Sequence, residues 1–166
     1  MSVTKRLIEA PAVIALGANL GDRKATLLSA VRELAGTDGV QVTAISTVIE
    51  TPALRPDGVD PDAPAYLNAV VLVSTTLTPV ELLTVLNGIE KAHGRVRAER
   101  WGDRTLDLDL VDFAGITSSS ELLTLPHPRA FERDFVLTPW LEVDPQAELP
   151  GHGPVAALVA ALEKDR

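Results

Sequence analysis

The feature that most constrains this chain is a run in which leucine alternates with aspartate, LDLDL at residues 106–110. A period of two is typical of a β-strand with one apolar and one polar face. On such a strand Asp107 and Asp109 point to one side, with Cα atoms about 6.7 Å apart, so both carboxylates can reach one cluster of cations. On a helix the same spacing would splay them. Because aspartate is a poor strand former, its presence here favours a functional site.

Just upstream, residues 91–104 concentrate positive charge in a chain that is otherwise acidic. The segment holds five basic residues against two acidic ones, whereas the whole chain of 166 residues carries a formal net charge of -8. Such an acidic chain is a poor candidate for tracking a nucleic-acid backbone, so we expect no nucleic-acid partner. A local cationic patch beside two carboxylates instead suits a compact polyanion that arrives with a divalent metal.

The composition predicts one globular domain that spans residues 1–166. Hydrophobic residues make up 46% and charged residues 23%, and the length is sufficient to bury a core without cross-links. The absence of cysteine excludes disulfides and thiolate chemistry. The first ten residues lack the apolar core of a signal peptide, and no apolar run is long enough to span a bilayer. We therefore expect a cytoplasmic protein with no membrane partner. We also expect a monomer.

The hydrophobic pattern predicts the order strand, helix, strand, strand, helix, strand. The strands are expected at residues 12–16, 40–50, 66–75 and 106–109, and the helices at 27–34 and 79–89. Asp22 is placed to cap the first helix, and Thr78 with Glu81 forms a capping box for the second. This order is the ferredoxin-like βαββαβ motif, an α+β fold whose antiparallel sheet carries both helices on one face. An amphipathic stretch at 153–162 adds C-terminal accessory helices to this core.

Three further segments have two interpretations when only the residues are considered. The glycine-containing segment 17–23 suits a tight turn or a ligand contact, and the proline-rich segment 51–65 suits a solvated loop or a lid. His127, Arg129 and Arg133 lie between apolar anchors in residues 123–140. Each of these three side chains suits a structural or solvated role as well as a binding role.

Five motifs, in this order and spacing, resemble the 6-hydroxymethyl-7,8-dihydropterin pyrophosphokinase family. They are GANLGDR (residues 17–23), ETPAL (50–54), PAYLNAVV (64–71), GRVRAERWGDRTLDLDL (94–110) and LPHPRAFERDFVLTPW (125–140). The resemblance covers about residues 13–140, and RWGxRTLDLDL is specific. It implies transfer of the terminal diphosphate of ATP to the hydroxymethyl group of a reduced pterin, with release of AMP, in folate biosynthesis.

The resemblance also implies roles for individual residues. Asp107 and Asp109 would hold two Mg2+ ions that bridge the ATP phosphates, and Arg95 and Arg104 would neutralise phosphate charge during transfer. The remaining ATP contacts would come from Leu83, Asn87, Glu90, Arg97, Leu110, Thr124, His127 and Arg133. The pterin would be held by Thr51, Pro52, Ala53, Leu54, Tyr66 and Asn68, and stacked between Trp101 and Phe135. Phosphoryl-type transfer needs mainly positioning and charge stabilisation, which carboxylate-bound metal ions and arginines provide.

Residues 51–65 and 94–104 are expected to close over the substrates, because water must be kept from ATP during the reaction. Four positions depart from the family pattern. Asp103 stands where Pro is common, Leu122 where some members have a phosphate-binding Arg, Pro128 in place of an aromatic residue, and Ala18 in place of Ser.

Two other functions fit the same aspartates. A palm-like nucleotidyl transferase or cyclase also uses two metal-binding aspartates on a ferredoxin-like sheet, and it would make polymer or cyclic nucleotide from a nucleoside triphosphate. In a non-catalytic ligand-binding module of the same fold, Asp107 and Asp109 would simply be solvated residues on one face of the strand. Formation of AMP only when pterin is present distinguishes the pyrophosphokinase from both.

Overall fold

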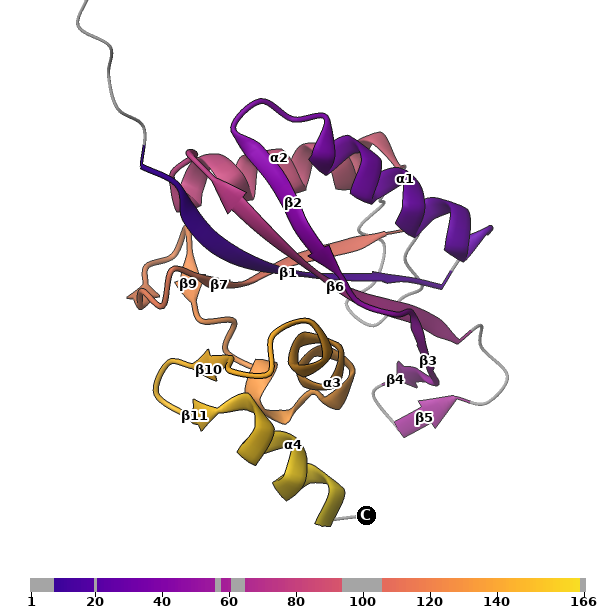
Figure 1. The fold of residues 1–166 in the computed structure, drawn as a ribbon. Coiled ribbons are helices and arrows are strands. Elements are labelled where there is room, and N and C mark those ends of the chain that lie inside the picture. The colour runs from indigo at the N-terminus through magenta and orange to yellow at the C-terminus, as the bar shows by residue number, and fades with distance from the viewer. Residues whose placement is uncertain (1–7, 20, 56–57, 61–64, 94–105, 165–166) are drawn as a thin grey trace, which may run out of the picture.

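The structure is a computed structural model that describes residues 8–19, 21–55, 58–60, 65–93 and 106–164, with backbone alone for 53–55 and 58–60. Its centre is an antiparallel sheet with strand order β2, β6, β1, β7 (Figure 1). The four strands are β1 (Ala10–Ala18), β2 (Val40–Ile45), β6 (Tyr66–Thr75) and β7 (Asp107–Phe113). A fifth strand, β3 (Ile49–Thr51), pairs with β6. The ferredoxin-like order predicted from the hydrophobic pattern is confirmed.

Two helices, α1 (Arg23–Ala35) and α2 (Pro79–Ala92), cover one face of this sheet (Figure 1). Both begin where the sequence predicts. The Asp22 side chain accepts a hydrogen bond from the Ala25 backbone N–H at 3.1 Å, and Thr78 and Glu81 form the reciprocal capping box. Leucines of the two helices pack with the sheet residues Ile14, Leu16, Val71 and Leu108 in one buried cluster.

The opposite face of the sheet is covered by the C-terminal helix α3 (Asp134–Val143), and α4 (Val155–Lys164) packs against α3 beyond it (Figure 1). A second buried cluster joins Val13, Val70 and Val111 of the sheet to Leu137 and Trp140 of α3. The expected accessory helices are therefore present, and they make the sheet the middle layer of three. Among the described residues, no helix has the length and apolar character needed to cross a membrane.

Short elements complete the described chain. They are the strand pairs β4 (Ala53–Arg55) with β5 (Gly58–Asp60), β8 (Ser118–Ser119) with β9 (Thr124–Leu125) and β10 (Glu148–Leu149) with β11 (Gly153–Pro154), and the 3-10 helix η1 (Ala130–Glu132). The β4–β5 pair lies within the proline-rich segment 51–65, for which the sequence predicted no strands.

The single strand expected at residues 40–50 is a wrong prediction, because the structure divides it into β2 and β3. Ser46 lies at the break, where its hydroxyl accepts a hydrogen bond from the Val70 N–H at 2.8 Å and donates one to the Thr47 carbonyl at 2.8 Å. Glu142 of α3 binds the Thr47 backbone N–H at 2.9 Å and the Thr47 hydroxyl at 2.7 Å. At the break the Ser46 N–H still donates to the Val70 carbonyl at 2.9 Å, the side-chain bonds add to it, and β3 then resumes pairing with β6.

Candidate active site

Asp107 and Asp109 lie on the side of β7 opposite to its leucines. Leu106, Leu108 and Leu110 are buried in the cluster beneath α1 and α2, whereas both aspartates are half-buried. The alternation LDLDL therefore has the structural meaning expected of it: the leucines fix the strand to the core, and the aspartates face the layer that contains α3.

The two aspartates are aligned with small residues of the neighbouring strand. Asp107 is in register with Gly17 of β1, and Asp109 with Ala15. On its other side Gly17 is in register with Asn68 of β6. Cross-strand partners share one face of a sheet, so Asp107, Gly17 and Asn68 form a row across three strands. A Cβ atom at Gly17 would lie 3.2 Å from the Asn68 side-chain oxygen. A side chain at the centre of the row would therefore crowd Asn68, whereas glycine leaves space between a carboxylate and an amide.

Asn68 belongs to a group of predicted pterin residues that the structure brings together. Its side chain is buried, and its Nδ2 donates a hydrogen bond to the Thr51 hydroxyl at 2.8 Å. Thr51 is in register with Tyr66, which lies on the same face of β6 as Asn68. Pro52 follows as an exposed residue, and Ala53 and Leu54 continue into β4. The predicted pterin residues of β3 and β6 thus lie on the same sheet face as the aspartates.

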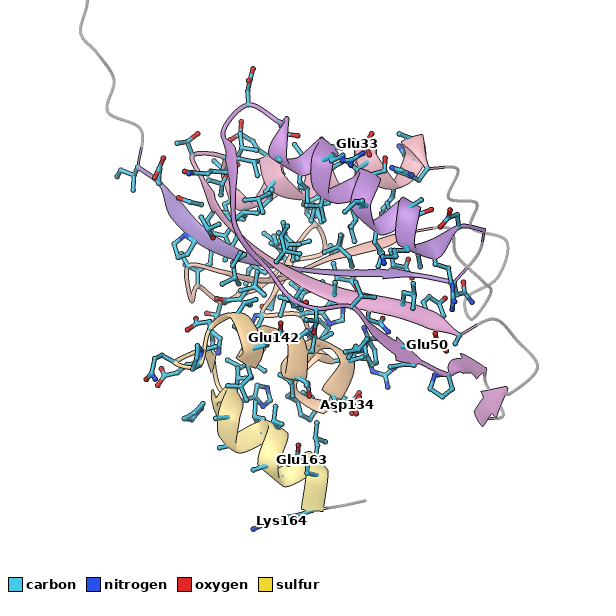
Figure 2. All side chains as sticks on the ribbon, turned by 45° about the vertical axis from the view of Figure 1, so that its right-hand side comes forward. Glu33, Glu50, Asp134, Glu142, Glu163 and Lys164 are labelled. Carbon is cyan, nitrogen blue, oxygen red and sulfur yellow. The ribbon has the colours of Figure 1, made fainter. Side chains whose placement is uncertain are left out.

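Arg23, the first residue of α1, contacts the chain at two places beside the predicted pterin residues. Arg23 Nη1 donates a hydrogen bond to the Ala65 carbonyl at 2.6 Å, just before β6 begins. Its Nη2 lies 3.8 Å from Oε2 of Glu50 in β3, and Figure 2 shows Glu50 at that end of the sheet. No sequence signal marks Arg23, because an arginine at a helix start is ordinarily solvated.

A second group, His127, Arg133 and Phe135, approaches Asp109 from the C-terminal part of the chain. Arg133 Nη1 lies 4.0 Å from Asp109 Oδ2, and the Arg133 guanidinium lies 5.6 Å from the centre of the Phe135 ring. The His127 backbone N–H donates to the Val111 carbonyl at 2.9 Å, which attaches this segment to β7. The structure therefore brings one predicted metal ligand together with three predicted substrate contacts.

The His127 imidazole has a pKa below its ordinary value. Burial is the main cause, and the positive charges of Arg133 and Arg129 act in the same direction, whereas the Asp109 carboxylate opposes them. His127 is therefore neutral at pH 7. A neutral imidazole can donate one hydrogen bond to an anionic ligand and accept another.

The predicted nucleotide residues are less uniformly placed. Asn87 of α2 and Thr124 of β9 are exposed, Leu83 is half-buried, and Leu110 lies in the core, where its backbone alone could meet a ligand. Glu90 is buried, and its Oε2 accepts a hydrogen bond from the Leu108 backbone N–H at 2.8 Å. The geometry thus connects Glu90 to the strand that bears the aspartates.

Several predicted features lie outside the described residues. They are Arg95, Arg97, Trp101, Asp103 and Arg104, and with them the expected lid at 94–104. Within the described ranges, no group of three or more His, Cys, Asp or Glu side chains could hold a metal ion. A divalent cation at Asp107 and Asp109 would need further oxygen ligands from substrate or water. This donor set fits Mg2+, which is usually held by one or two carboxylates, substrate phosphates and waters.

Gly17 is the residue whose placement the sequence analysis missed, since the expected strand ended at Leu16 and Gly17 was assigned to a turn. The structure continues β1 through Gly17 to Ala18. A glycine that directly follows an apolar strand is a usable signal, because glycine within a strand often marks a close approach by a ligand or another chain segment.

Comparisons with known proteins identify relatives of this chain. A model of the 7,8-dihydro-6-hydroxymethylpterin-pyrophosphokinase (HPPK) family matches residues 13–145. A 2-amino-4-hydroxy-6-hydroxymethyldihydropteridine pyrophosphokinase of Methylorubrum extorquens is 45% identical over 140 residues, which are 84% of this chain and 86% of that protein. The protein of the same name from Bacillus subtilis is 44% identical over 137 residues, 82% of this chain and 80% of its own length.

Solved structures show the same fold at low sequence identity. The wild-type HPPK-DHPS of Plasmodium falciparum with pteroate superimposes with a TM-score of 0.73 at 13% identity. The match covers 95% of this chain but 45% of the Plasmodium chain, so this chain spans less than half of that protein. With the family model and the sequence relatives, the chain belongs to the 7,8-dihydro-6-hydroxymethylpterin-pyrophosphokinase family.

Proposed function

We propose that this chain catalyses Mg2+-dependent transfer of diphosphate from ATP to the hydroxymethyl group of 6-hydroxymethyl-7,8-dihydropterin in folate biosynthesis. The products are AMP and the pterin diphosphate. The observation that carries the proposal is the row of Asp107, Gly17 and Asn68 across three strands of a chain in this family. The row supports the proposal because metal and phosphate at Asp107 would lie beside a heterocycle at Asn68, and Gly17 puts no side chain between them.

The reaction joins the pterin hydroxyl oxygen to the β-phosphorus of ATP. The bond between that phosphorus and the oxygen bridging to the α-phosphate breaks, AMP leaves with the bridging oxygen, and the hydroxyl proton passes to solvent. Asp107 and Asp109 would hold Mg2+, whose charge neutralises the phosphates and aligns them for attack. Arg133, 4.0 Å from Asp109, adds a cation at the same place, and neutral His127 offers a hydrogen-bond donor. Asn68 would supply a polar contact to the pterin, and its hydrogen bond to the Thr51 hydroxyl supports this role by fixing the amide.

Finer features of the family belong to the proposal as well. Two Mg2+ ions would bind per chain, because two adjacent carboxylates and a triphosphate supply oxygens for two octahedral ions. Arg95, Arg97, Arg104 and Trp101 would complete the phosphate and pterin contacts. We also propose that the enzyme is a monomer that acts in the cytoplasm. The count of Mn2+ bound with a non-hydrolysable ATP analogue tests the two-ion assignment, and a single ion per chain would overturn it.

The test of the function is incubation with ATP, Mg2+ and 6-hydroxymethyl-7,8-dihydropterin, followed by separation of the products. AMP and pterin diphosphate should form in equal amounts, and neither should form when pterin is omitted. Folded wild-type protein that gives no AMP in the complete mixture contradicts the proposal. Polymer or cyclic nucleotide formed without pterin would instead identify a nucleotidyl transferase or cyclase.

A further inference from the structure

Glu90 is a buried acidic residue of α2, on the side of the sheet that α1 and α2 cover. Its side chain comes from α2, the residue is 3% exposed, and its Oε2 accepts a hydrogen bond from the Leu108 backbone N–H at 2.8 Å. Leu108 stands between Asp107 and Asp109 in the chain. The buried side chain is therefore bonded to the backbone amide of the residue that lies between the two predicted metal ligands.

The geometry of β7 explains why this amide needs a partner. In the described sheet β7 is an edge strand that pairs with β1. Successive residues of a strand direct their N–H groups to opposite sides, so an amide that reaches Glu90 points away from β1. Asp107 and Asp109 then direct theirs toward Gly17 and Ala15, with which they are in register. The aspartate segment is thus held in the plane of the sheet by β1 on one side and by Glu90 on the other.

The register of β7 also changes close to this point. Leu110 is aligned with Ile14 and Asp112 with Val13, so Val111 is an extra residue in β7. A slip of one residue would move every side chain of a strand to the other face. A strand with an irregular register three residues from Leu108 therefore depends on a fixed contact to keep both aspartates on the α3 side.

We infer that Glu90 is a positioning residue: by binding the Leu108 amide it holds Asp107 and Asp109 in the register that lets both carboxylates share a divalent cation. The inference rests on the proposed function only in assigning that cation to the two aspartates. A hydrogen bond from a backbone N–H to a carboxyl oxygen is strengthened where water is excluded. Residues that orient metal ligands typically change metal affinity or activity by about 10- to 100-fold when removed.

The experiment compares three substitutions of Glu90 in the full chain. Glu90→Ala removes the acceptor, Glu90→Asp keeps the carboxyl group but shortens the side chain by about 1.5 Å, and Glu90→Gln keeps an acceptor oxygen at full length. Thr84→Ala is the matched control, since Thr84 is an exposed residue of α2 whose hydroxyl donates a hydrogen bond to the Val80 carbonyl of the same helix.

Two measurements without turnover report the result. The first is hydrogen exchange of the Leu108 amide in ligand-free protein, and the second is the affinity for Mn2+ in the presence of a non-hydrolysable ATP analogue. Glu90→Ala and Glu90→Asp should speed Leu108 exchange at least about 10-fold and weaken Mn2+ binding about 10- to 100-fold. Glu90→Gln should stay within about threefold of wild type, and Thr84→Ala should change neither value.

Unchanged Leu108 exchange and Mn2+ affinity in Glu90→Asp would overturn the inference, as would a loss confined to the KM for ATP, which would make Glu90 a nucleotide contact. If Glu90→Ala does not fold, the Asp and Gln variants still decide the question. Wild-type protein that binds Mn2+ through Asp107 but makes no AMP would reject the proposed function and leave the role of Glu90 standing.

Discussion

At the scale of single residues, Asp112 is a buried carboxyl group that the proposed chemistry does not use. It is 9% exposed and follows the extra residue Val111 in β7. Its Oδ2 accepts a hydrogen bond from the Gly115 N–H at 3.3 Å, and no described residue bonds to its Oδ1. Burial raises the pKa of Asp112, and hydrogen bonds from the backbone of Gly115 and Phe113 oppose this effect only in part.

Asp112→Asn should therefore stabilise the protein at neutral pH. The folded state binds a proton at Asp112 more tightly than the unfolded state does, so the stability of the wild type falls as pH rises from the ordinary value of 3.8 through the raised pKa. Asparagine removes the charge and should add about 1 kcal/mol at pH 7, or roughly 2–4 °C in Tm. Thermal unfolding at pH 7 and pH 4 checks this. The gain should shrink at pH 4, and the exposed control Asp38→Asn should show little change at either pH.

Asp109→Asn tests the proposed metal carboxylate without altering the shape of the side chain. Activity should fall about 100- to 1,000-fold, because the substitution removes a negative charge that would hold Mg2+ and phosphate in place. Steady-state assays over a range of Mg2+ concentrations measure the loss, and an unchanged Tm shows that the fold is intact. Near wild-type activity at every Mg2+ concentration would exclude Asp109 from the metal site.

At the scale of secondary-structure elements, α3 is joined to the break between β2 and β3 by Glu142, whose carboxylate binds Thr47. Figure 2 shows Glu142 on α3. Its two bonds to Thr47 are solvent-exposed, so Glu142→Ala should cost less than about 1 kcal/mol of global stability. The substitution should loosen β3 more than it lowers global stability, because Thr47 lies just before this strand, which ends at the predicted pterin contact Thr51.

We expect Glu142→Ala to speed amide exchange across residues 47–51 and to raise the KM for pterin about threefold with little change in kcat. Glu142→Gln should recover part of both effects, since it keeps an acceptor for the Thr47 N–H. Glu163→Ala, an exposed change on α4, is the control. Equal exchange at residues 47–51 in all three variants would show that the contact does not position β3.

The elements that sequence could predict are those specified by local pattern. The capping residues Asp22 and Thr78 and the LDLDL run act within a few residues of themselves, and the helices and strand they specify are present. The break after β2 depends on Glu142, which lies 95 positions from Thr47 in the chain, so no local window contains its cause. Pro139 inside α3 similarly weakens the helical pattern of an element that the tertiary packing stabilises.

The candidate site shows the same division between local pattern and topology. Alternation alone indicates that Asp107 and Asp109 share a face. The strand order β6, β1, β7 makes neighbours of strands that are far apart in the chain. This order places Asp107 beside Gly17, and Gly17 beside Asn68. Family resemblance supplied the residue roles that neither spacing nor composition could give.

At the scale of the whole molecule, the sheet separates two buried clusters, one under α1 and α2 and one under α3 and α4. If residues 1–166 form one domain, both clusters should be lost in one transition, because they share the same sheet. Leu86→Ala and Leu137→Ala form a matched pair, since each removes a fully buried leucine from one cluster.

Each of these two substitutions should cost about 2–5 kcal/mol and lower the same single Tm. Calorimetry together with near-ultraviolet circular dichroism, which detects Trp140 in the second cluster, measures this. Two resolved transitions, each moved by only one of the variants, would divide the chain into two folding units.

The late position of α3 in the chain has a consequence for synthesis on the ribosome. All strands of the main sheet are complete at Phe113, yet the helix that covers its second face begins only at Asp134. A nascent chain that folds its amino-terminal part first exposes Val13, Val70 and Val111 to the surroundings until Leu137 and Trp140 have left the exit tunnel. During this interval the half-covered sheet is an apolar surface of the kind that chaperones bind.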